Sequence, residues 1–115
     1  MSQNEIRIIT KIIREMSLFM LLHGYKDFNL SIMSDPQHTY ITIKSAVLKD
    51  DIVKLILENL NRKRQLEIET YGWELLGDID EKSDFAILGS LIDSVDHHIE
   101  DNHSILRLKR MNKYL

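Results

Sequence analysis

Apolar residues recur at spacings of three and four along the first part of the chain, which is the period of an amphipathic helix. This apolar stripe consists of Ile6, Ile9, Ile13, Met16 and Met20, and Ile12 and Phe19 widen it. The pattern predicts a helix over residues 5–23. Its second half, Met16–Leu22, is apolar nearly all round, so we expect it to be buried on more than one side. Gly24 follows where a left-handed residue commonly closes a helix.

Strict alternation of apolar and polar residues then replaces the helical period. Phe28, Leu30 and Ile32 alternate with Asn29, Ser31 and Met33, and Ile41 and Ile43 alternate with Tyr40, Thr42 and Lys44. The segment Ser34–Gln37, with sequence SDPQ, has the composition of a turn. These residues predict an antiparallel hairpin with one apolar face, which is typical of a sheet that helices cover on one side.

Two further helices are predicted from the middle of the chain. The first runs over Lys49–Arg62, with acidic residues near its start and the basic run Arg62, Lys63 and Arg64 at its end, as suits the helix dipole. The second covers Gln65–Leu76 and carries Tyr71 and Trp73.

The last stretch predicts a short apolar helix from Asp84, a strand over Val95–Glu100, a tight turn at residues 101–103 and a final strand over residues 104–110. The order of elements therefore predicts a single α+β domain over residues 1–115. Its helices would form one layer over one face of a mainly antiparallel four-stranded sheet.

Composition narrows the class of protein. The 115 residues are 43% hydrophobic and 29% charged, which is ordinary for one soluble domain. There is no cysteine, which excludes disulfides and thiolate chemistry and suits a reducing compartment. The chain begins without a basic segment or a span long enough for a bilayer, so we expect a cytoplasmic protein. Its net charge of −3 argues against general binding to membranes or nucleic acid.

The final strand departs from this charge balance. Arg107, Lys109, Arg110 and Lys113 lie close together with no acidic residue among them. We expect a solvated edge strand that charge protects from further pairing. The alternative is nucleic-acid binding through the same basic residues, with a steeply salt-dependent affinity.

Glu15 lies on the first predicted helix, which ends in His23–Tyr25, and the hairpin over residues 28–44 follows. This arrangement resembles the ATPase fold that bacterial anti-sigma factor kinases share with sensor histidine kinases, the GHKL superfamily, whose glutamate helix ends in a similar way. The segment Leu88–Val95 is similar to the family's last helix and its junction with a strand, and Leu106–Arg110 looks like the final strand.

The residues that bind nucleotide in this family are missing here. The family's magnesium-binding asparagine corresponds to Phe19, and an aromatic ring cannot ligate a hard cation. The box that reads adenine corresponds to Ser45–Lys49, with neither the aspartate nor the glycines. The second phosphate loop corresponds to Lys82–Phe85, where Asp84 would repel phosphate. The resemblance therefore implies a degenerate member that uses no cofactor, with Glu15 catalytic only if a divergent ATP-binding kinase-like protein is the correct alternative.

We accordingly expect a regulatory or protein-interaction module rather than an enzyme, with a protein partner or a second copy of the chain. The candidate partner-binding residues are Arg62, Lys63, Arg64, Tyr71 and Trp73. A metal site is not expected, and the weak candidates for one are His98, Glu100 and His103, since His97 and His98 point to opposite faces of a strand. On its apolar face, His97 is expected to be a hydrogen-bonded core histidine.

Overall fold

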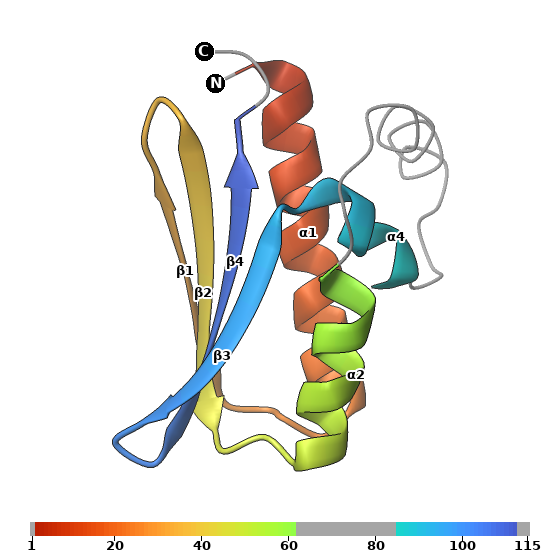
Figure 1. Ribbon diagram of the computed structural model, residues 1–115, viewed down its shortest axis with the longest axis vertical. Helices are drawn as coiled ribbons and strands as arrows, with labels where there is room; N and C mark the ends of the chain where they lie inside the picture. Colours follow the sequence, from red (N-terminus) through yellow and green to blue (C-terminus); the bar gives the residue numbers. More distant parts are fainter. Residues whose placement is uncertain (1, 62–84, 113–115) are drawn as a thin grey trace.

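The computed structural model describes residues 2–61 and 85–112. Its helices are α1 (Gln3–Leu22), α2 (Asp50–Leu60) and α4 (Phe85–Leu91), and its strands are β1 (Phe28–Ser34), β2 (His38–Ala46), β3 (Ser94–Glu100) and β4 (His103–Met111). The helices form one layer and the strands the other (Figure 1). The predicted two-layer α+β sandwich is therefore confirmed.

The four strands form one sheet in the order β1-β2-β4-β3, and every neighbouring pair is antiparallel. Two sequential hairpins are joined through the central pair β2 and β4, where Ile41 lies opposite Leu108 and Ile43 opposite Leu106. The last strand is thus an interior strand. The expectation that it forms a charge-protected edge is wrong, because the chain returns after β3 to pair with β2 as well.

The core lies between the two layers. Its buried side chains include Ile12 and Met16 of α1, Ile56 and Leu60 of α2, Leu88 and Leu91 of α4, and the inner positions of β2 and β4. The second half of α1 is less buried than predicted, since Leu21 and Leu22 are 52% and 69% exposed. Each residue turns a helix by about 100°, so these two side chains point away from the face that buries Phe19 and Met20.

Both ends of α1 are capped by groups that the sequence supplies locally. The Ser2 hydroxyl accepts a hydrogen bond from the Glu5 amide at 3.1 Å. At the other end Gly24 has φ of 88°, and the Tyr25 amide donates to the Met20 carbonyl at 2.9 Å. The predicted left-handed closure at Gly24 is confirmed.

Tight turns set the register of both hairpins. The Asp35 carboxylate accepts hydrogen bonds from the backbone amides of Gln37 at 2.8 Å and His38 at 2.7 Å. Between β3 and β4, Asp101 and Asn102 have φ of 50° and 61°. Two successive residues with positive φ match the right-handed twist of a two-residue hairpin, so the turns fall where the sequence predicts them.

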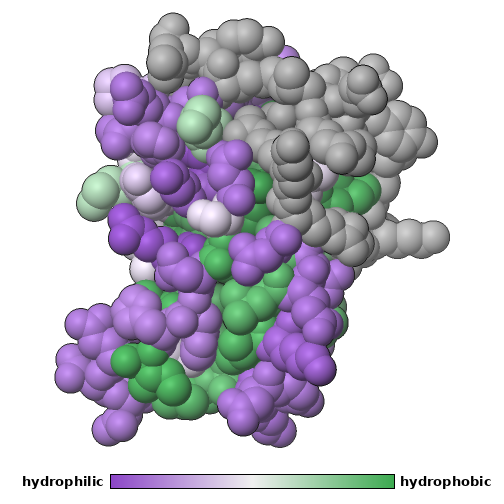
Figure 2. Space-filling model, viewed as in Figure 1, coloured by the Kyte–Doolittle hydropathy of each residue, from purple (hydrophilic) through white to green (hydrophobic). Residues whose placement is uncertain are grey.

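On the face shown in Figure 2, hydrophilic side chains predominate over the strands and α2, and apolar side chains form a strip between β3 and α2. No helix within residues 2–61 and 85–112 is long and apolar enough to cross a bilayer. The predicted helix over Gln65–Leu76 lies outside the described residues.

Candidate functional site

An aromatic stack of Phe19 and Phe85 joins α1 to α4. The rings of Phe19 and Phe85 have centroids 4.2 Å apart and planes inclined by only 13°. On its other side Phe19 contacts the His23 ring, also at 4.2 Å, with the planes inclined by 35°. Phe19 is 5% exposed, so this stack fills the contact between the two helices.

Glu15 lies one turn before Phe19 on α1 and is fully buried. Its carboxylate receives a hydrogen bond from the Arg14 guanidinium at 2.7 Å and lies 3.8 Å from the Lys11 ammonium. A buried carboxylate is costly unless cations and hydrogen bonds compensate its charge. Lys11 and Arg14 supply that compensation from the same helix, so Glu15 is already engaged by neighbouring side chains.

The segment Ser45–Lys49, which we expect to correspond to the adenine-reading box, is held by hydrogen bonds within the protein. The Leu48 amide donates to the Ser104 hydroxyl at 2.9 Å, and the Lys49 amide donates to the Tyr25 hydroxyl at 3.0 Å. The Ser45 hydroxyl donates to the Ala46 carbonyl at 2.8 Å. Phosphate recognition by a loop uses backbone amides that point at the ligand. Here the backbone amides of Leu48 and Lys49 already donate to the hydroxyls of Ser104 and Tyr25.

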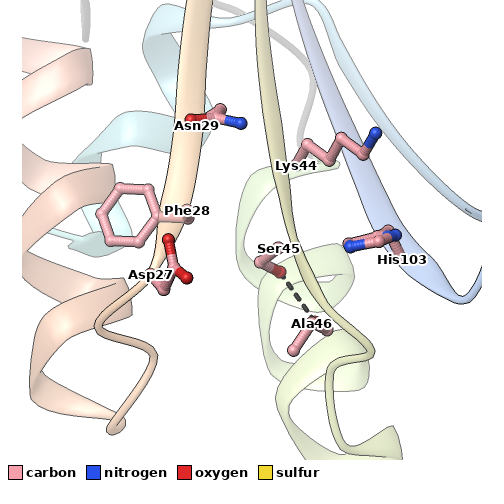
Figure 3. Close-up of a pocket in the computed structure, with 7 residues that line it drawn as sticks. All are labelled: Asp27, Phe28, Asn29, Lys44, Ser45, Ala46 and His103. Carbon is pink, nitrogen blue, oxygen red and sulfur yellow. Dashed lines mark hydrogen bonds between the residues drawn. The ribbon is translucent and has the colours of Figure 1, made fainter.

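A polar hollow of about 320 Å³ lies where β1 begins, β2 ends and β4 begins (Figure 3). Its lining residues are Asp27, Phe28, Asn29, Lys44, Ser45, Ala46 and His103. The Asp27 carboxylate, the Lys44 ammonium and the His103 imidazole are all exposed, so water competes with a ligand for each of them. Its volume is at the low end for small-molecule sites, and it lacks the apolar enclosure that usually holds a ligand.

The weak metal-site candidates share the outer face of the sheet. The imidazole Nε2 of His98 lies 3.5 Å from the Glu100 carboxylate, and Glu100 is directly opposite His103 in the hairpin. The Nδ1 atom of His103, however, bonds the Asp101 carbonyl at 2.8 Å. Within the described residues no three histidine, aspartate or glutamate side chains are grouped to hold a metal ion.

His97 is half-buried on the inner face of β3, as expected for a hydrogen-bonded core histidine. Its Nε2 lies 2.8 Å from the hydroxyl of Ser104, which is fully buried and also accepts from the Leu48 amide. Burial lowers the pKa of His97 below its ordinary value, and the nearby His98 lowers it further. The pair therefore joins β3, β4 and the segment before α2, and the buried hydroxyl is inaccessible to a substrate.

The basic cluster of the last strand divides between the two faces of the sheet. Arg107 lies on the outer face, with its guanidinium 4.4 Å from the centre of the Tyr40 ring. Arg110 is instead buried on the inner face, where it pairs with Glu5. Arg110 follows Leu106 and Leu108 at a spacing of two residues, so it points inward as they do. This spacing is the sequence signal that places Arg110 on the inner face. Lys113 lies outside the described residues.

The residues expected to bind a partner also fall outside the described part of the chain. They are Arg62, Lys63, Arg64, Tyr71 and Trp73, and their role stays a prediction. In comparisons with known proteins, no family model, no curated protein and no solved structure matches this chain.

Proposed function

We propose that this chain is a small, non-catalytic protein-interaction module, cytoplasmic and regulatory, on a scaffold related to the histidine-kinase and anti-sigma ATPase fold. Its action would be association with another protein rather than chemistry on a substrate. The order of elements that suggested the resemblance recurs among the described residues: a long helix, a hairpin, a helix, a short helix and a second hairpin.

The stack of Phe19 on Phe85 is the observation that carries this proposal. If the resemblance holds, Phe19 occupies the position of the magnesium ligand, and α4 follows the place of a phosphate loop. A buried ring at 4.2 Å from its neighbour offers no oxygen to a cation and fills the space beside it. Opening that space for a nucleotide would expose two aromatic side chains, which opposes binding.

The hydrogen bonds of the Ser45–Lys49 segment point the same way. The amides of Leu48 and Lys49 are bound by side chains of the fold, so a ligand would have to replace those bonds before it could use the amides. Replacing one hydrogen bond with another gives little net free energy.

The alternative is a divergent ATP-binding kinase-like protein, and one observation favours it. Glu15 keeps a carboxylate on the flank of α1 that the resemblance assigns to activation of a nucleophile, and this carboxylate is buried. Its engagement by Arg14 and Lys11 leaves the alternative weaker, because a general base must reach its substrate.

Thermal unfolding with and without millimolar ATP and magnesium separates the two functions. A ligand at one hundred times its dissociation constant stabilises a protein by roughly 2.7 kcal/mol, which is about 4–8 °C for a domain near this size. We expect no shift. A shift of that size, or ATP turnover that the variant Glu15→Gln abolishes, would overturn the proposal in favour of the kinase-like protein.

A further inference from the structure

The two edges of the sheet differ in how they are protected from further pairing. The edge strand β3 carries Asp96, His98 and Glu100 on its outer face. The other edge strand, β1, has the sequence FNLSIMS and contains no charged residue, no proline and no glycine. Natural sheets protect their edges with charge, proline or bulges, and β1 uses none of these. Its outer edge has no neighbouring strand in the described part of the chain.

Apolar side chains are exposed along this unprotected edge. Ile32 lies on the inner face opposite the buried Ile41, yet it is 50% exposed. Met33 on the outer face is 70% exposed. The helix layer thus covers β2 but leaves the second half of β1 open.

Exposed apolar surface also occurs on α1. Glu15 and Phe19 lie on the flank that faces α4, where Phe19 meets Phe85. Ile6 precedes Glu15 by nine residues, which is two and a half turns, so it projects from the opposite side of the helix. Ile6 is 48% exposed. The helix α1 therefore also carries an exposed apolar group, on its side away from α4.

We propose that two copies of this chain associate by antiparallel pairing of β1 with the partner's β1 across a two-fold axis, joining their sheets into one. The inference rests on the proposed function and names the partner of the interaction module. With Ser31 on the axis, Leu30 lies opposite the partner's Ile32, and Asn29 lies opposite the partner's Met33. Both groups of each apolar pair lie on the inner face, where they cover each other.

Self-complementarity favours a second copy over another occupant. A two-fold axis places the same surface on both sides of an interface. A charged residue on the strand would therefore lie close to residues of the same charge on the partner strand. The strand β1 itself brings no charge into this arrangement, and the one acidic pair that the register forms, Asp27 with the partner's Asp35, lies just outside the strand ends. On β3, by contrast, the same operation brings together two strands that each carry Asp96 and Glu100. A foreign peptide would need side-chain pockets along β1 for its selection, whereas identical strands need only their shared alternation.

Sedimentation velocity of the full chain at tens of micromolar tests the pairing. We expect wild type to sediment as a dimer. Ile32→Lys should produce a monomer, with the dimer dissociation constant raised at least tenfold, because the lysine would face the partner's Leu30. Ile99→Lys is the matched control, since Ile99 is also an inner-face residue of an edge strand and is 57% exposed. This control should remain a dimer.

Met33→Lys is a second test that does not depend on the inner face. Met33 is 70% exposed, so its replacement disturbs little within one copy, and circular dichroism will report whether the fold persists. It should also weaken the dimer. The proposal is overturned if wild type is monomeric, or if Ile99→Lys dissociates the dimer while the two β1 variants do not. A monomeric wild type without an ATP-dependent thermal shift would remove self-pairing alone, whereas a shift would remove the proposed function itself.

Discussion

Arg110 and Glu5 form a buried ion pair between the last strand and the first helix. The guanidinium Nε and Nη2 atoms donate to one oxygen of the Glu5 carboxylate at 3.0 and 2.6 Å, and both residues are 1% exposed. The Nη1 atom donates to the Leu91 carbonyl at the end of α4, at 2.5 Å. The start of α1 and the end of β4 lie side by side as a result (Figure 1).

Replacing Arg110 with methionine should destabilise the fold strongly. The change leaves the Glu5 carboxylate buried without its guanidinium, and breaking a buried pair costs about 3–5 kcal/mol. Urea denaturation should show this loss, while Arg107→Met on the outer face should cost no more than about 1 kcal/mol of cation–π attraction to Tyr40. The double variant Glu5→Leu with Arg110→Met should recover much of the stability. Equal effects at Arg107 and Arg110 would contradict this account.

The elements of this fold could be predicted from local patterns, and so could the inner face of Arg110, but its ion-pair partner could not. Period and alternation located each described helix and strand, and the turn residues marked both hairpins. The basic cluster of the last strand suggested an exposed edge, because charged residues are usually solvated. Glu5 compensates the charge of the buried Arg110, and these residues are 105 positions apart, so no local window contains both.

The candidate site likewise has features that the sequence predicts and features that depend on how the elements pack. The sequence alone marked Phe19 as a residue that cannot bind a metal ion, because side-chain chemistry decides that question. Its stacking partner Phe85 depends on how α4 packs against α1, which alternation and periodicity do not determine. The hydrogen bond of His97 was predictable from its apolar face. Its partner depends on strand register: Ser104 lies opposite Ile99, which is two residues from His97 on the same face of β3.

The contact of Phe19 with Phe85 should be measurable as a coupling energy. Phe19→Ala should cost about 3–5 kcal/mol of stability, as truncation of a buried phenylalanine usually does. Since part of that cost is loss of the ring contact, Phe85→Ala should cost less in the Phe19→Ala background than in wild type. A double-mutant cycle by urea denaturation should give a coupling of about 0.5–1.5 kcal/mol. Strict additivity of the two substitutions would show that the rings do not interact in solution.

Asp35 should hold the turn between β1 and β2 through its charged form. Hydrogen bonds from the amides of His38 and Gln37 lower the pKa of this carboxyl below its ordinary value. Its stabilising effect is therefore fully present above the ordinary aspartate pKa, about 3.9, and is lost as the pH falls through the lower folded value. Asp35→Ala should accelerate hydrogen exchange at the Gln37 and His38 amides near neutral pH. Asp96→Ala is the control, and unchanged exchange in Asp35→Ala would refute the assignment.

His97 should make the fold less stable in mild acid. Because its folded pKa is lowered, first by burial and then by His98, the native state takes up a proton less readily than the unfolded chain. Stability is then greatest above the unfolded histidine pKa, about 6.5, and falls as the pH drops from there through the folded value. Urea midpoints measured at several pH values should fall less steeply in His97→Gln than in wild type. His103→Gln, at an exposed position, should retain the wild-type slope. An NMR titration in which His97 protonates at or above its ordinary pKa would reverse the sign of this dependence and exclude the hydrogen-bonded neutral imidazole.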